Sequence, residues 1–169
     1  MDARYINAFI NSVCNTFGKM CGLEVTVGKP ELKTANEPLS DVSSVIGFSG
    51  GATGSVVLHF RYDVASKMAS AFAGTEITPD HEDFADALGE LANMVAGGAK
   101  SAFEGFNISI SLPNVIVGAN HSVFGTSLTQ RLLIPCATEL GQFHVEVGMV
   151  MGKAGAGAPP QQTRIGART

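Results

Sequence analysis

The stretch Asp86-Ala87-Leu88-Gly89-Glu90-Leu91-Ala92-Asn93-Met94-Val95-Ala96-Gly97 lies in a run whose apolar residues recur with a helical period. At about 100° per residue, the apolar side chains gather on one side and predict a buried stripe. The stripe consists of Phe84, Leu88, Leu91, Val95 and Ala102. Four residues fall together on the opposite side: Asp86, Glu90, Asn93 and Gly97. We therefore expect an amphipathic helix whose outer face carries carboxylates and a carboxamide.

Glycine is unusually frequent in this predicted helix, at positions 89, 97 and 98. A glycine inside a helix costs roughly 1 kcal/mol relative to alanine. Close approach of another backbone is a common reason to tolerate that cost. Glu90 and Asn93 are neighbours at i and i+3. We therefore expect them to project side by side from a face that something else can approach closely.

The pattern Asp86-xxx-Glu90-Leu91-x-Asn93-xxx-Gly97, followed by Ala99-Lys100, resembles the signature of the CheX/CheC chemotaxis phosphatases, and of CheX in particular. A first helix and two strand segments resemble the same family, in the same order along the chain. These segments are Tyr5–Ile10, Gly54–Leu58 and Ser111–Gly118. The likeness extends over residues 4–151, and the ordered series is more specific than the Glu-xx-Asn pair alone.

The resemblance implies a phosphatase that hydrolyses the phospho-aspartate of a CheY-like response regulator. Glu90 and Asn93 would be its catalytic residues. Asn93 would align the attacking water, and Glu90 would pair with a lysine of the partner. No metal or cofactor would be bound by this chain itself. Its acidic face cannot hold a phosphoryl group without cations. The response regulator would supply Mg²⁺ and the lysine. The resemblance also implies a homodimer paired through sheet edges, with Val115–Val117 and the hairpin over 130–150 as candidate edges.

Other interpretations of these residues stay open at this stage. A solvated helix face would also carry residues such as Glu90 and Asn93. Asp86 either tunes the electrostatic field of the site or contacts the partner, or it only makes the helix surface soluble. We interpret Gly97 as steric clearance for a partner and Lys100 as a docking charge. Two rival functions are a non-catalytic module that docks response regulators and a structural dimer with the same fold.

Charge and composition exclude several partners. The net charge is −4, and residues 152–169 hold three basic residues and no acid, so the body carries 8 basic against 15 acidic residues. Such a surface disfavours nucleic acid and favours a protein that presents a lysine or a metal ion. No apolar run reaches the length of a membrane span, and residues 1–5 do not resemble the start of a signal peptide, which predicts a cytoplasmic protein. Hydrophobic residues make up 45% of the chain, which favours self-association.

Periodicity and turn signals predict helices over 3–20, 62–73 and 79–104. They predict strands over 23–28, 31–37, 42–49, 55–60, 107–112, 115–117, 130–138 and 142–150. Because strands and helices do not alternate regularly, we expect an α+β fold, a mostly antiparallel sheet covered by helices. The resemblance implies the same architecture, a CheC-like sandwich. We assign residues 1–151 to one domain and the Gly-, Pro- and Gln-rich residues 152–169 to a disordered tail or linker.

Alternative sites are weakly supported. The glycine-rich stretch over 49–54 lacks the ending of a phosphate-binding loop, and we interpret it as a β-turn. The four histidines fall in separate segments without metal-ligand spacing, and no nucleophile elbow is present. The three cysteines are most simply reduced thiols. The first helix offers only amides and a hydroxyl where some CheC-like relatives carry a second Glu-xx-Asn pair, so we expect one site per chain.

Overall fold

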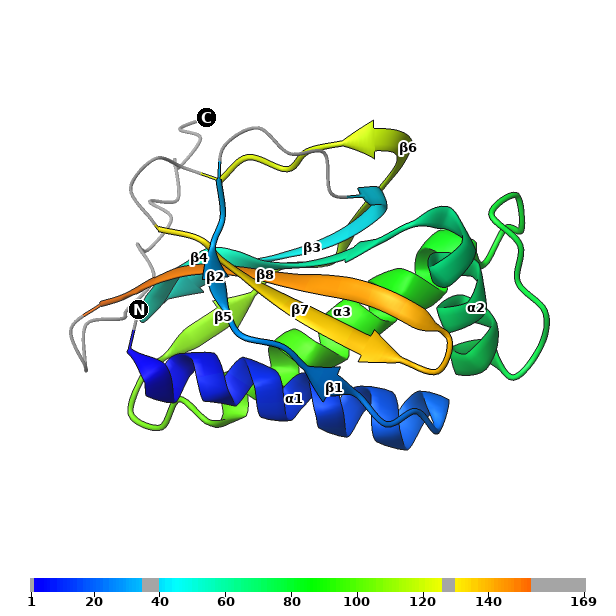
Figure 1. Cartoon of the computed structure of the whole chain (residues 1–169). Coiled ribbons are helices and arrows are strands. Elements are labelled where there is room, and N and C mark those ends of the chain that lie inside the picture. Colours follow the sequence, from blue (N-terminus) through cyan, green and yellow to red (C-terminus); the bar gives the residue numbers. More distant parts are fainter. Residues whose placement is uncertain (1, 35–39, 126–129, 153–169) are drawn as a thin grey trace, which may run out of the picture.

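The computed structural model describes residues 2–34, 40–125 and 130–152, and apart from Gly152 the tail expected over 152–169 lies outside these ranges. Within them, three helices lie against one face of an eight-stranded sheet, which confirms the α+β prediction (Figure 1). The helices are α1 (Ala3–Cys21), α2 (Tyr62–Ala73) and α3 (Phe84–Ser101). The strands are β1 (Thr26–Val27), β2 (Glu31–Leu32), β3 (Ser40–Gly50), β4 (Ala52–Phe60), β5 (Ile108–Ile110), β6 (Asn114–His121), β7 (Leu132–Thr138) and β8 (Gly141–Met151).

Every strand pair in the sheet is antiparallel, and the order along the sheet is β1-β7-β8-β4-β3-β5. β2 also pairs with β7, and β6 also pairs with β3. The glycine-rich stretch forms the tight β3–β4 turn, as expected, with Gly50 at φ +83°. β1 and β2 are shorter than the predicted strands, and positions 35–37 lie outside the described residues.

The strand order shows which of the two predicted dimerisation edges lies at an edge of the sheet. β6 pairs with β3 on one side and with no other strand of the described residues, so the edge predicted over 115–117 exists. The prediction that the hairpin over 130–150 forms a sheet edge is wrong, because β8 lies between β7 and β4. β7 is in turn covered by β1 and β2.

Helices α1 and α2 are bounded much as their sequences predict. The Asp2 carboxylate accepts the backbone N–H of Arg4 and caps α1, and Gly22 ends it at φ +67°. α2 ends at Gly74, also in the left-handed region. Its N-cap, Arg61, makes no capping hydrogen bond, but Asp41 of β3 accepts the N–H of Tyr62 at 3.1 Å. A buried carboxylate from a strand therefore caps this helix.

The long helix α3 begins at Phe84 and not at the predicted Pro79. The Thr78 hydroxyl donates to the Asp80 side chain at 2.6 Å and does not cap a helix. Ile77 is buried, and its N–H donates to Ser70 of α2 at 2.8 Å. The chain therefore stays fastened to α2 through Ile77, and residues 78–83 form turns before α3 starts. The helix predicted over 79–104 would carry six acids, at positions 80, 82, 83, 86, 90 and 104, but only Asp86 and Glu90 lie on α3.

The predicted buried stripe of α3 is confirmed for Phe84, Leu88, Leu91 and Val95, which are at most 2% exposed. Ala102 is exposed, and its placement in the stripe is wrong. The helix ends at Ser101, and Phe103 turns inward instead. The Phe103 ring packs edge-on against Tyr5 of α1, with ring centroids 5.4 Å apart.

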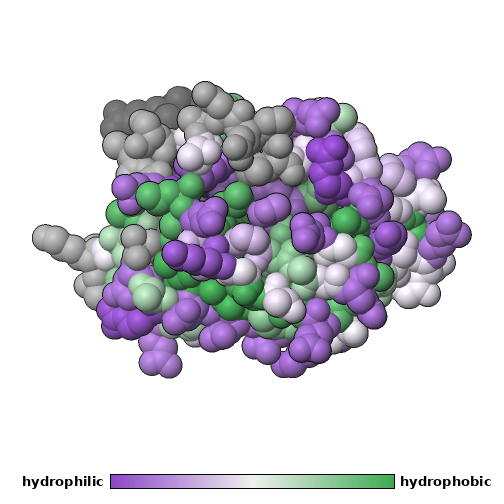
Figure 2. All heavy atoms as spheres, in the orientation of Figure 1, coloured by the Kyte–Doolittle hydropathy of each residue, from purple (hydrophilic) through white to green (hydrophobic). Residues whose placement is uncertain are grey.

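One hydrophobic core fills the space between the helices and the sheet. β3, β4 and β8 contribute alternate side chains to it, as the pleat of a strand requires. Phe143 of β8 stacks between Phe17 of α1 and Phe60 of β4, with centroid distances of 4.8 and 5.4 Å. Outside this core, hydrophilic side chains cover the solvent side of α1, while hydrophobic residues show across the middle of the same view (Figure 2).

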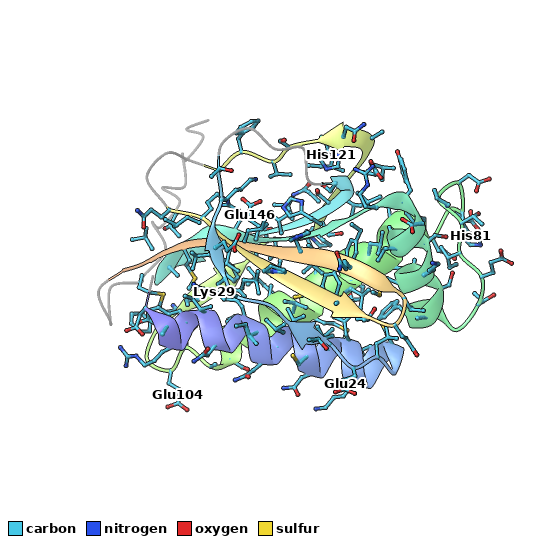
Figure 3. All side chains as sticks on the ribbon, in the orientation of Figure 1. Glu24, Lys29, His81, Glu104, His121 and Glu146 are labelled. Carbon is cyan, nitrogen blue, oxygen red and sulfur yellow. The ribbon has the colours of Figure 1, made fainter. Side chains whose placement is uncertain are left out.

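The opposite face of the sheet carries a buried charged network centred on Glu146. Figure 3 shows Glu146 and His121 on the side of the sheet away from α1. The fully buried Glu146 carboxylate lies 2.7 Å from Lys33 Nζ and 2.8 Å from His59 Nε2, and it also accepts from Arg131. His59 Nδ1 lies 2.9 Å from Ser43 Oγ, which lies 2.7 Å from His121 Nε2. Two histidines that the sequence places in separate segments therefore share one hydroxyl.

Burial and charge set the pKa values of this network. Burial alone would raise the pKa of Glu146, but hydrogen bonds from His59, Lys33 and Arg131 outweigh it and lower that pKa to about 2. Burial lowers the pKa of His59, and the neighbouring Glu146 only partly opposes this. The network is therefore a buried carboxylate held by two cations and a neutral histidine.

Candidate functional site

The predicted site residues all lie on α3. Asp86, Glu90 and Lys100 are exposed, whereas Asn93 and Gly97 are half-buried. Their spacing of three and four residues places Asp86, Glu90, Asn93 and Gly97 on successive turns of one side of the helix. We call these four residues the polar ridge. Lys100 lies in the last turn of the same helix.

The three glycines of α3 have three different surroundings. A Cβ on Gly89 would lie 3.2 Å from the Pro113 side chain and 3.4 Å from that of Val115. A Cβ on Gly98 would collide with the hydroxyl of Ser12. A Cβ on Gly97 would meet nothing within 4 Å. Gly89 and Gly98 therefore permit close packing within the chain, against side chains rather than backbone, and Gly97 leaves open space on the polar ridge.

A hollow of about 380 Å³ lies beside Glu90, between α3 and the start of β6. Two carboxylates, those of Asp86 and Glu90, line it from α3. Pro113 and Val115 line it from the other side and give it an apolar wall. No motif in the sequence connects Pro113 and Val115 with Glu90. The one local signal is Gly89, a helical glycine next to Glu90 whose missing side chain leaves room for both.

The polar ridge has no internal counter-charge. Among residues 2–34, 40–125 and 130–152, no ion pair or hydrogen bond engages the side chains of Asp86, Glu90 or Asn93. The Glu90 carboxylate and the Asn93 carboxamide are therefore available to another molecule. A carboxylate can pair with a cation, and a carboxamide can both donate to and accept from a water molecule.

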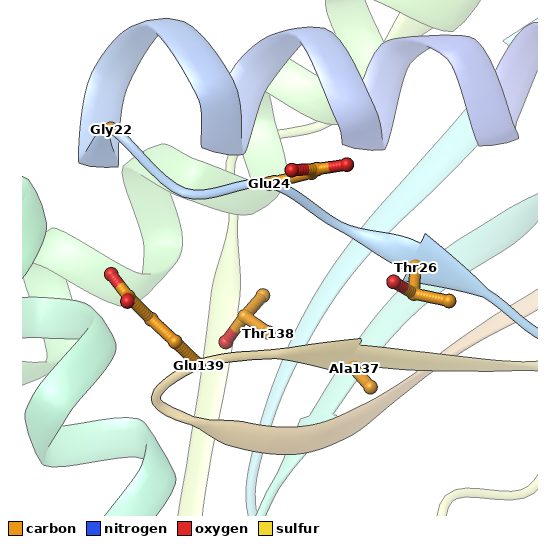
Figure 4. Close-up of a pocket in the computed structure, with 6 residues that line it drawn as sticks. All are labelled: Gly22, Glu24, Thr26, Ala137, Thr138 and Glu139. Carbon is orange, nitrogen blue, oxygen red and sulfur yellow. The ribbon is translucent and has the colours of Figure 1, made fainter.

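Other hollows of the structure do not offer comparable chemistry. One lies between the segment after α1 and the β7–β8 hairpin, with Glu24, Thr26, Thr138 and Glu139 on its walls (Figure 4). No Asn or Gln side chain of the described residues lines this hollow beside its two glutamates, and no residue of α3 reaches it. Another lies between α1 and α3, where Asn11 and Asn15 of α1 face Met94. The polar side chains of α1 that line it are amides, hydroxyls and Lys19, without a carboxylate.

Conventional catalytic groups are not assembled in the described part of the chain. No three His, Cys, Asp or Glu side chains there come together as a metal site. Ser43, His59 and Glu146 form a hydrogen-bonded series that resembles a hydrolase triad. All three are at most 1% exposed, so no substrate can reach the Ser43 hydroxyl. No helix of the described residues is long and apolar enough to span a membrane.

Comparisons with known proteins identify the family of the chain. The family model described as chemotaxis phosphatase CheX matches residues 42–137. The CheY-P phosphatase CheX of Thermotoga maritima is 34% identical over 142 residues, which cover 82% of this chain and 92% of that protein.

Solved structures extend the likeness to most of the chain. A CheC-like superfamily protein from Shewanella sp. PV-4 is 31% identical at a TM-score of 0.80, covering 89% of this chain and 99% of that one. CheX in the CheX–CheY–BeF₃–Mg²⁺ complex from Borrelia burgdorferi has a TM-score of 0.72 and covers 86% of this chain and 97% of that one. At 23% identity this second likeness shows the fold alone. The family match and the Thermotoga relative together show that the chain belongs to the CheX family of chemotaxis phosphatases.

Proposed function

We propose that this phosphatase of the CheX family removes the phosphoryl group from the aspartyl phosphate of a CheY-like response regulator. The observation that carries the proposal is the polar ridge: a carboxylate and a carboxamide, one helical turn apart, with no partner among the described residues. The Thermotoga relative is a CheY-P phosphatase, and the Borrelia structure is a CheX–CheY complex. Both support the choice of substrate.

In this reaction the chain contributes the alignment of a water molecule and no nucleophile of its own. An aspartyl phosphate is a reactive mixed anhydride, so its hydrolysis needs an aligned water more than a strong nucleophile. The Asn93 carboxamide aligns that water for in-line attack on phosphorus. The P–O bond to the aspartyl oxygen breaks, and the regulator's carboxylate and inorganic phosphate are released.

Glu90 has a docking role in this mechanism. The transition state spreads negative charge over the phosphoryl oxygens and requires cations. The polar ridge supplies none, so the regulator supplies Mg²⁺ and a lysine. The Borrelia complex contains Mg²⁺, which supports this division. Glu90 pairs with the regulator's lysine and fixes the position from which Asn93 enters its active site. Asp86, Gly97 and Lys100 complete the contact surface.

Two further properties belong to the proposal. The chain forms a homodimer through the outer edge of β6, where Ile116 and Val117 are 41% and 47% exposed. It works in the cytoplasm, which is consistent with three free cysteines.

The test is phosphate release from a response regulator phosphorylated with acetyl phosphate, measured with and without this protein. The proposal predicts faster release at catalytic amounts of the protein. A protein that binds the phosphorylated regulator without accelerating release would be the docking module. A protein that neither binds nor accelerates would be the structural dimer.

A further inference from the structure

The turn between β5 and β6, Ser111-Leu112-Pro113, is held on both sides. The backbone N–H of Ser111 donates to Gly47 O at 2.9 Å, and the N–H of Gly47 donates back to Ser111 Oγ at 2.9 Å. The same hydroxyl donates to Leu112 O at 2.8 Å. On the other side, the Pro113 ring packs against α3 at Gly89, the residue before Glu90. The turn is therefore fixed to both β3 and α3.

Leu112 stands exposed at the middle of this turn. Its exposed fraction of 85% is the highest of the large hydrophobic residues in the described part of the chain. A single exposed leucine is ordinary on a protein surface. Leu112 differs because the backbone on both sides of it is immobilised, and because Pro113 next to it forms the wall of the hollow beside Glu90.

The backbone of a turn that is already held by hydrogen bonds and packing loses little conformational freedom when a partner covers it. Apolar anchors beside a charged pair are a common arrangement in interfaces, because the anchor excludes water from the pair. The surface around Leu112 continues directly into the polar ridge through Pro113 and Gly89. The partner that engages Glu90 must therefore also lie over this turn.

From this placement we propose that Leu112 is a specificity-determining contact for the phosphorylated response regulator. Leu112 packs on an apolar patch of the regulator next to the lysine that Glu90 binds, and Pro113 and Val115 face the aliphatic part of that lysine. Gly89 and Pro113 act as positioning residues, because their contact sets the distance between α3 and the turn. This inference rests on the proposed function and adds to it the chemistry of the partner surface: an apolar patch beside a basic side chain.

The experiment compares Leu112→Ser with Leu32→Ser in steady-state dephosphorylation of one phosphorylated regulator. Leu32 is a matched control, because it is 60% exposed and lies on β2 at the other end of the sheet. Leu112→Ser should raise KM about tenfold and leave kcat unchanged, since it removes apolar contact made equally in the ground and transition states. Leu112→Met should restore KM, and Leu32→Ser should match the wild type.

Three results would overturn the inference: an unchanged KM for Leu112→Ser, an equal rise for Leu32→Ser, or a change in the mass of the free protein. The last result would make Leu112 a contact between copies of this chain. Asn93→Ala is measured in the same series and separates this inference from the proposed function. If Asn93→Ala is inactive and Leu112→Ser is normal, only the present inference fails. If Asn93→Ala is fully active, the proposed mechanism itself fails.

Discussion

Among single residues, the three glycines of α3 differ in what surrounds them, and this difference predicts opposite effects of alanine at positions 97 and 98. Their number alone indicated that this helix is approached closely. Only the structure separates Gly89 and Gly98, which are packed against Pro113 and Ser12, from Gly97, which faces open space. From a sequence one can estimate how much a helical glycine destabilises the helix, but not which neighbouring group packs into the space that it leaves.

Gly97→Ala tests whether that open space belongs to a partner. Within the chain the new methyl group meets nothing, and alanine favours the helix, so stability should rise by up to about 1 kcal/mol. Affinity for the phosphorylated regulator should nevertheless fall, on the order of tenfold for a misfitted contact. Urea unfolding and binding titration measure the two effects.

Gly98→Ala is the matched control for this prediction. Its methyl group collides with Ser12, so it should lower stability by about 1–3 kcal/mol. If Gly97→Ala binds the phosphorylated regulator with wild-type affinity, Gly97 is not part of the contact surface.

Among the elements, the helices α1 and α2 and the central strands followed from the sequence because their signals are local. Asp2, Gly22 and Gly74 mark ends that a reader of the chain can find. The start of α3 did not follow, because Thr78-Pro79-Asp80 satisfies every local rule for a helix start. A tertiary hydrogen bond from Ile77 to Ser70 overrides those rules.

The buried network beneath β6 was also invisible in the sequence. Its members come from β3, β4, β6, β8 and the segments beside β2 and β7, and no spacing connects them. Glu146 falls with Gln142 and His144 at the alternate positions of β8 that face away from the helices, where the alternation predicts exposed side chains. Its burial and its partners cannot be inferred without the sheet order.

Glu146→Gln tests the structural role of that network. The substitution leaves Lys33 and Arg131 buried beside an uncharged side chain, and each is only 10% exposed. Loss of one member of a buried ion pair costs about 3–5 kcal/mol. The free energy of unfolding should fall by that amount, whereas Glu139→Gln on the exposed β7–β8 turn should leave it unchanged. Equal stability of the two variants would contradict the role given to the network.

For the whole molecule, the network predicts how stability depends on pH. Because the pKa of His59 is lowered in the folded protein, His59 takes up a proton more readily in the unfolded chain. As the pH falls below about 6.5, protonation of His59 therefore favours unfolding. The pKa of Glu146 is about 2 against an ordinary 4.5, so its contribution is complete above pH 4.5 and is lost as the pH falls toward 2. Both groups therefore favour folding at neutral pH.

Stability should accordingly decline in two stages on acidification, first below about pH 6.5 and then more steeply below about pH 4.5. Urea unfolding between pH 8 and pH 3 measures this. In His59→Gln the first stage should shrink. A free energy of unfolding that is constant from pH 7 to pH 4 would contradict the assignment.

Oligomeric state is the second property of the whole molecule. The outer edge of β6, which no other described strand pairs with, and its exposed Ile116 and Val117 predict a dimer at micromolar concentration. Light scattering should give about twice the chain mass of 17.5 kDa. Ile116→Lys should shift the mass to that of the monomer, because a charge on an exposed edge opposes strand pairing. A wild-type mass near 17.5 kDa would reject the dimer.

The fold and the position of the polar ridge could thus be predicted, because a long amphipathic helix and an ordered series of segments are local patterns. What lies beside the polar ridge could not be predicted, because Pro113 reaches Gly89 only through the course of β5 and β6. The chemical step is our proposal that the Asn93 carboxamide aligns the water that attacks the phosphoryl group.

Asn93→Ala tests that claim most directly, in single-turnover hydrolysis of one phosphorylated response regulator with its affinity measured in parallel. We expect turnover to fall by roughly 10²–10⁴-fold while affinity changes little, because one positioned catalytic group is removed and the Glu90 contact stays. Glu90→Ala should instead weaken binding, and high salt should weaken wild-type binding in the same way. If Asn93→Ala hydrolyses the aspartyl phosphate at the wild-type rate, Asn93 does not align the attacking water and the proposed mechanism is wrong.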